Sequence, residues 1–112
     1  WFTDEMDGLG VKYFEHEGFD VVSHGAANLR SDYGEIEPEQ LHGYALDQVP
    51  DNADTLVIGG GGFRAIGAIN ALESSLNRPV ISANQASMWV ALGIAGIPAR
   101  NSPYGRIFES IP

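Results

Sequence analysis

The pattern of apolar and small residues is most regular between Thr55 and Ala91. The apolar run Thr55 to Ile58 is followed by four consecutive glycines and then by apolar residues at helical spacing. A break at Asn77-Arg78-Pro79 precedes a second apolar run, Val80 to Ser82, and a further helical segment. This order predicts a strand, a glycine-rich loop, a helix, a second strand, a short loop and a second helix.

The flanking segments predict further elements. Thr3 is a suitable N-cap for a helix over residues 4–17, and residues 19–23 have the pattern of a strand. A second helix begins at Glu37 and Pro38 and runs to about residue 48. The last helix, over residues 86–95, precedes a short edge strand at 97–99. The apolar residues of the tail, 100–112, are expected to dock on a surface.

The apolar residues at helical spacing are expected to face a core. They are Met6, Leu9, Tyr13 and Phe14; Leu41, Tyr44, Ala45 and Leu46; Ala65, Ile66, Ala68, Ile69, Leu72 and Leu76; and Met88 with Trp89.

Strands that alternate with helices indicate an α/β fold with a parallel sheet. We therefore expect a three-layer α/β/α arrangement around a small parallel sheet of three or four strands. Ligands bind to such sheets beyond the carboxyl ends of the strands. The glycine loop, Asn84 with Gln85, and His24 are all predicted to lie at that edge.

Composition and charge narrow the class of protein. The chain has 112 residues, of which 44% are hydrophobic, enough for a single domain over residues 1–112. With 15 acidic and 6 basic residues, the net charge of −9 argues against binding to nucleic acid or to anionic membranes. No apolar run reaches the roughly 18 residues of a membrane span, and no signal peptide opens the sequence, so we expect a cytoplasmic protein. The absence of cysteine excludes disulfides and a cysteine nucleophile from this chain.

The glycine loop is the strongest candidate for a binding site. Glycines let backbone amides approach a ligand closely, and the helix that follows favours an anion at its N-terminus. A carboxylate or phosphate fits this site. Arg64 can add hydrogen-bond donors to it, or can pair instead with an acid on a neighbouring helix. The alternative is a purely structural glycine-rich turn.

Other motifs are less informative. Gly60 to Ala65 matches the dinucleotide-binding pattern G-x-G-x-x-A, but the next strand ends in Ser82-Ala83-Asn84 without the acid that would hold a ribose. The three histidines are not spaced as metal ligands, so no metal site is expected. His24 can transfer protons or be a hydrogen-bonded structural histidine. The loop over residues 25–37 is either functional or a solvated connection.

The sequence also resembles a known family. The stretch GGGGFRAIGAINALE and the later RPVISANQASMW resemble the second half of the Asp/Glu racemase superfamily, in the branch that holds maleate isomerase and arylmalonate decarboxylase. The opening TDEMDGLGVKYFEHEGFDVV and Tyr104-Gly105-Arg106 are similar to segments of the same branch. Within it, the wording GGFRAIGAI is most similar to the EutA-like ectoine-utilisation proteins.

The resemblance implies two α/β domains that hold a small carboxylate between them without a cofactor, this chain being the C-terminal domain. It implies that a catalytic cysteine of the family falls at Gly60, and that a functional tyrosine falls at Phe2. The substrate-binding residues it implies are Gly60, Gly61, Gly62 and Phe63, with Arg64, Asn84 and Phe2.

Two functions follow. In the first, the chain provides the carboxylate site of an isomerase, decarboxylase or racemase, and a missing N-terminal domain provides the reactive residue. In the second, it is a non-catalytic carboxylate-binding or assembly protein on the same scaffold. The expected partners are a small carboxylate, the missing domain and further copies of the chain in a homo-oligomer.

Overall fold

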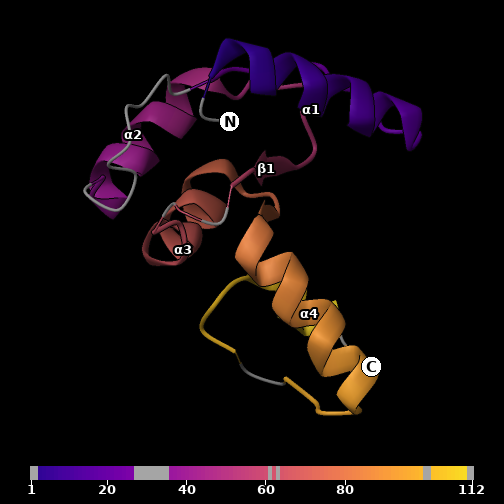
Figure 1. Cartoon of the computed structure of the whole chain (residues 1–112). Helices are drawn as coiled ribbons and strands as arrows, with labels where there is room; N and C mark the ends of the chain where they lie inside the picture. The colour runs from indigo at the N-terminus through magenta and orange to yellow at the C-terminus, as the bar shows by residue number, and fades with distance from the viewer. Residues whose placement is uncertain (1–2, 27–35, 61, 63, 100–101, 111–112) are drawn as a thin grey trace.

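The computed structural model describes residues 3–26, 36–60, 62, 64–99 and 102–110. In chain order the elements are α1 (Asp4–His16), α2 (Pro38–Gln48), β1 (Leu56–Ile58), α3 (Ile66–Leu76), β2 (Val80–Ser82), α4 (Ala83–Ala95) and the 3-10 helix η2 (Arg106–Ser110). Helices α1 and α2 lie at one end of the molecule and α4 at the other (Figure 1). The predicted α/β class with a small parallel sheet is confirmed.

The sheet consists of β1 and β2, paired in parallel with Leu56 opposite Val80 and Ile58 opposite Ser82. Helix α3 connects the two strands and packs against β2. In the described part of the chain the sheet therefore has two strands, rather than the three or four expected from the sequence.

The strand predicted at residues 19–23 is wrong. This segment is not hydrogen-bonded to the sheet, and Phe19 and Val22 are 62% and 42% exposed. It is held instead by α2, because Ser23 Oγ donates to the carbonyl of Gln48 at 3.1 Å and Tyr44 Oη donates to the carbonyl of Ala26 at 3.0 Å. Its strand-like composition does not by itself provide a pairing partner.

The edge strand predicted at residues 97–99 is also wrong. Gly96 has a φ of +68° and ends α4 in the left-handed conformation, and Ile97 N donates to the carbonyl of Leu92 at 3.0 Å. The backbone of Ile97 thus completes the C-terminus of the helix. Helix α4 starts earlier than predicted, at Ala83 rather than residue 86.

The core lies where α2, α3 and the strands meet. Ile69, Leu72 and Val80 are completely buried, and burying a side chain of this size contributes about 1.5–3 kcal/mol. The other core residues are Leu41, Ala45, Ile58, Ala65 and Ala68. A Cβ atom on Gly67 would lie 2.9 Å from Pro38 Cγ, so glycine permits the close approach of α2 and α3.

Several residues predicted to face a core are exposed instead. On α1 the apolar face is open to solvent, and the buried residues are Asp7 and Gly10. The exposed residues are Met6, Leu9, Tyr13, Tyr44, Leu46, Ile66 and Met88. The tail prediction is confirmed for Phe108, which is buried where η2 packs against α4 and β2.

Candidate active site

The two strand ends bring the glycine loop and the start of α4 together at one edge of the sheet. Ile58 is the partner of Ser82 in the parallel register, so Gly59 and Ala83, the next residues, leave the sheet side by side. Gly59 is buried and Gly60 is half-buried. The predicted location of the glycine loop and of Asn84 with Gln85 at the carboxyl ends of the strands is thus confirmed, but the short loop predicted after the second strand is wrong, because α4 begins directly at Ala83.

The backbone of the glycine loop depends on glycine at one position. Gly60 has a φ of +91°, a region that residues with a Cβ rarely adopt. Gly62 is exposed, and Gly61 and Phe63 lie outside the described residues. The position to which the resemblance assigns a cysteine therefore has a backbone that favours the absence of a side chain.

The N-termini of α3 and α4 differ in how they are capped. Ser82 Oγ accepts from Gln85 N at 3.3 Å, and Ser82 N donates to Gln85 Oε1 at 2.8 Å, which closes a reciprocal capping box at α4. Helix α3 has Ala65 as its N-cap, which offers no side-chain acceptor. Neither helix carries an acidic residue in its first turn. An anion at this edge would therefore meet its best donors at α3.

The remaining predicted site residues are placed as follows. Asn84 is exposed in the first turn of α4. Arg64 Nη2 donates to Glu37 Oε1 at 2.7 Å, so its partner is the acid at the start of α2. Both side chains are at least half exposed, which makes this a modest surface ion pair. Phe2 lies outside the described residues.

An unpredicted pair of side chains joins α1 to the segment that follows it. His24 Nδ1 is 2.6 Å from Asp7 Oδ2, which joins the segment after α1 to the first turn of α1. Asp7 is buried, with a side chain only 7% exposed, whereas the His24 side chain is 55% exposed. In the sequence, Asp7 cannot be distinguished from the other acids in the first turn of the helix, so the sequence indicates only His24 as a candidate site residue.

A cavity of about 870 Å³ connects this pair with the glycine loop. Asp7, His24, Gly59, Gly60 and Ser82 all contribute to its lining. Much of the remaining wall is apolar and comes from α2, β1 and residues 19–22. Predominantly apolar walls with a few polar groups are typical of sites for small molecules.

Tyr44 also lines this cavity, and its phenol interacts electrostatically with two acids of α1. Burial raises the pKa of the Tyr44 phenol, and the negative charges of Asp7 and Asp4 raise it further. The Tyr44 hydroxyl is therefore a neutral donor at physiological pH, and it donates to the carbonyl of Ala26.

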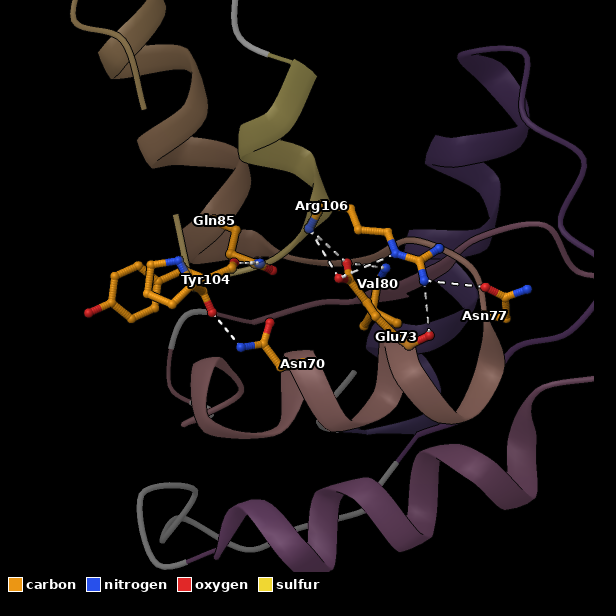
Figure 2. A network of polar contacts seen from close by, with 8 residues as sticks. Asn70, Glu73, Asn77, Val80, Gln85, Tyr104 and Arg106 are labelled. Atoms are coloured by element: carbon orange, nitrogen blue, oxygen red, sulfur yellow. Dashed lines mark hydrogen bonds and ion pairs between the residues drawn. The ribbon is translucent and has the colours of Figure 1, made fainter. Parts of the chain in front are cut away.

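A buried carboxylate joins α3 and β2 to the C-terminal segment. Glu73, on α3, accepts from Val80 N at 3.1 Å and from Arg106 N at 3.1 Å, and Figure 2 shows its side chain directed at both. Gln85 Nε2 donates to the carbonyl of Tyr104. The network ties β2, α3 and the start of α4 to the segment before η2.

This segment passes very close to α4. Gly105 has a φ of +113°, and a Cβ atom there would overlap Gln85 Nε2 and lie 2.9 Å from Ile69 Cγ2. Asn70 Nδ2 donates to the carbonyl of Pro103 from the opposite side (Figure 2). Glycine at this position therefore allows the C-terminal segment to lock the start of α4 in place.

Within the described residues, no group of three or more His, Cys, Asp or Glu side chains is arranged to hold a metal ion. His42 Nε2 is 3.1 Å from Ser75 Oγ, between α2 and α3 and outside the lining of the cavity. In the same part of the chain, none of the helices has both the length and the apolar character that crossing a membrane requires.

Comparison with known proteins gives relatives of one kind. A sequence model of the arylmalonate decarboxylase family matches residues 2–108. Arylmalonate decarboxylase from Bordetella bronchiseptica is 36% identical over 66 residues, which is 58% of this chain and 27% of that protein.

Solved structures agree with this match. The maleate isomerase Iso from Pseudomonas putida S16 has a TM-score of 0.86 at 27% identity, over 94% of this chain and 44% of that chain. A cysteine-to-alanine variant of that isomerase, solved with maleate, has a TM-score of 0.83 at 28% identity, over 96% of this chain and 44% of that chain. The chain thus spans less than half the length of these relatives.

Proposed function

Because this chain belongs to the arylmalonate decarboxylase family, we propose that it forms part of a cofactor-independent enzyme acting on a small carboxylate. One observation carries the proposal. The glycine loop leaves β1 at the sheet edge and leads into the N-terminus of α3, where the N-cap residue, Ala65, has no side chain that could accept a hydrogen bond from the first backbone N–H groups of the helix. Backbone amides held in this way stabilise a carboxylate, or the negative charge that develops on it during reaction.

The carboxylate is bound by the backbone amides of Gly60, Gly61, Gly62 and Phe63 in this proposal. Asn84, exposed in the first turn of α4, is a further candidate for binding the carboxylate. Arg64 acts indirectly, because its ion pair with Glu37 anchors the end of the loop to α2. Phe2 is the position to which the resemblance assigns a tyrosine, and it has no hydroxyl.

The substrate is a small mono- or dicarboxylic acid. The relatives are named for the decarboxylation of arylmalonates and the isomerisation of maleate, and one isomerase structure contains maleate. The similarity of GGFRAIGAI to the ectoine-utilisation proteins adds acids derived from amino acids as a narrower candidate class. We further propose that the chain is the C-terminal domain of a two-domain protein that forms homo-oligomers.

The amide signals of the glycine loop provide the test. In ¹H–¹⁵N spectra, titration with millimolar malonate or maleate is expected to shift the amides of Gly60 and Gly62, while Gly43, exposed on α2, serves as an internal reference. Acetamide, which is neutral, is the matched control ligand and should leave both loop signals unchanged. If a folded protein shows no shift at Gly60 or Gly62 with either dicarboxylate, the loop does not bind carboxylates.

A second candidate function is binding without catalysis. It is favoured by Gly60 itself, which has neither a thiol nor a backbone suited to a side chain. Carboxylate binding without turnover of phenylmalonate or maleate by the native gene product would support this alternative.

A further inference from the structure

The paired side chains of Asp7 and His24 contribute to the same cavity as the glycine loop. Both residues line the cavity that also contains Gly59 and Gly60. The segment that carries His24 leaves α1 and reaches this cavity without joining the sheet. A titratable side chain thus shares a cavity with the glycine loop.

The geometry of the pair fixes the role of each ring nitrogen. When Nδ1 carries the proton and donates to Asp7 Oδ2 at 2.6 Å, Nε2 of a neutral imidazole is left as the acceptor. The ring remains accessible, because the His24 side chain is 55% exposed while Asp7 is buried behind it. This arrangement, a buried carboxylate that orients an accessible histidine, is common among general bases.

The second oxygen of Asp7 is unusual. Oδ1 is buried and has no hydrogen-bond partner among the described residues. A buried carboxylate with one unpartnered oxygen is costly unless a positive charge or a further donor comes close. The His24 ring is therefore the side-chain partner that the described structure gives to this carboxylate.

The other charged side chains that line the cavity are acidic, which distinguishes His24 from them. Asp20 and Asp54 also line it, and Asp4 and Asp7 lie close enough to Tyr44 to raise the pKa of its phenol. Among the described lining residues there is no lysine or arginine. His24 is therefore the basic side chain in that set.

We propose that His24 is the proton-transfer residue of this protein, with Asp7 as its positioning residue. This inference rests on the proposed function. Nε2 of His24 takes the proton from the carbon next to the bound carboxylate, and the electron pair of that C–H bond moves into the carboxylate to form an enediolate. Return of the proton from the imidazolium to the same carbon restores the acid.

Decarboxylation is compatible with the same group. The bond to the departing carboxylate breaks, its electron pair forms the enediolate, carbon dioxide leaves, and the protonated His24 delivers its proton to the carbon. This chain contains no cysteine, so covalent addition of a thiolate during isomerisation would need a residue from outside it. The substrate class that suits His24 is carboxylic acids that react through an enediolate, such as 2-substituted malonates.

The test uses the native gene product that contains this chain, with phenylmalonate as the probe in D₂O. The expected product is phenylacetate with one deuterium at the carbon that lost the carboxylate. His24→Gln should lower kcat about 100-fold or more with KM within threefold, as for loss of a general acid or base. His42→Gln, a histidine outside the cavity, is the matched control and should stay within threefold of the unmodified protein.

A second measurement separates the positioning role of Asp7 and does not depend on turnover. In ¹⁵N spectra of the imidazole rings, His24 is expected to be the Nδ1–H tautomer when neutral, and Asp7→Asn should redistribute the proton between the two nitrogens. Titration with malonate should shift the His24 ring signals together with the amides of Gly60 and Gly62. The His42 signals should not move.

The outcomes distinguish this inference from the proposed function. If the glycine amides respond to malonate while the His24 ring does not, or if His24→Gln keeps turnover within threefold, His24 is not the proton-transfer residue and the carboxylate site stands. If neither the glycine amides nor His24 respond and no product forms, the proposed function fails and the role of His24 fails with it.

Discussion

The carboxylate of Glu73 accepts the backbone N–H of Arg106 at 3.1 Å, so that a buried acid on α3 fixes the segment that follows α4. The same carboxylate accepts from Val80 N on β2. Glu73→Ala leaves two backbone donors without their partner, and hydrogen bonds to a charged group contribute roughly 1.5–3 kcal/mol each. We expect the free energy of unfolding to fall by about 3 kcal/mol in urea titrations.

The matched control for Glu73 is Glu39→Ala, at an exposed position of α2. Its effect should stay below about 0.5 kcal/mol. A loss of less than about 1 kcal/mol for Glu73→Ala would show that the network does not stabilise the fold.

Two glycines should respond in opposite directions to the same substitution. Gly105→Ala places a Cβ atom against Gln85 and Ile69 at a φ of +113°, and should cost about 1–3 kcal/mol. Gly43→Ala, within α2, meets no atom within 4 Å and should raise stability by about 0.5–1 kcal/mol. Thermal unfolding of both variants decides the matter. Equal effects would contradict the close packing at Gly105.

Introducing a thiol at Gly60 should not be a simple gain of function. Gly60→Cys forces a residue with a Cβ to a φ of +91°, which costs about 1–2 kcal/mol or requires the loop to change. We expect a lower melting temperature together with weaker binding of malonate. An unchanged melting temperature and unchanged malonate affinity would show that the loop accepts side chains at this position.

The ionisation of Tyr44 should make stability depend on alkaline pH. Its pKa is raised in the folded state by burial and by Asp7 and Asp4, so the folded protein holds the phenolic proton more tightly than the unfolded chain. The free energy of unfolding should therefore fall as pH rises above about 10, the pKa of an unperturbed tyrosine. Urea titrations between pH 8 and pH 11 measure this slope.

Tyr44→Phe should reduce the alkaline loss of stability, whereas Tyr13→Phe, an exposed position on α1, should not. When tyrosinate absorbance at 295 nm is followed against pH, Tyr44→Phe should lack an ionisation step that the unmodified protein shows at high pH. An identical pH dependence in both variants would mean that Tyr44 is not the responsible group.

The open apolar face of α1 should promote association of the chain. Leu9 and Tyr13 are each 61% exposed and Met6 is 42% exposed. Leu9→Glu should lower the apparent mass in sedimentation velocity experiments at the highest concentrations. Ser74→Glu, which adds the same charge on the exposed side of α3, is the control. A monomer at all concentrations for the unmodified chain would contradict this expectation.

Local patterns predicted much of the fold. β1, α3, β2 and α2 were predicted almost to the residue, since apolar runs, glycines and prolines mark their limits in the sequence. The segment at 19–23 was mispredicted because its apolar alternation is local, whereas a strand requires a neighbour. For α1 the helix was predicted but its buried face was not, because small and polar residues, Gly10 and Asp7, turn inward.

The candidate site was predicted only in part. The glycine loop could be located because it follows an apolar run and precedes a helix. The pairing of Asp7 with His24 spans 17 residues and depends on how the segment after α1 folds back. The sequence does not decide whether Arg64 binds a ligand or pairs with an acid for a similar reason, since its partner Glu37 lies 27 residues away at the start of α2.

The junction between β2 and α4 limits how this protein can diversify. Ser82 is at once the last residue of the strand and the cap of the helix, so no residue intervenes whose replacement or duplication would leave both elements intact. The chain between β1 and α3, in contrast, carries seven positions, 59 to 65, before the helix begins. Insertions and side-chain substitutions that change specificity are therefore better tolerated between β1 and α3 than between β2 and α4.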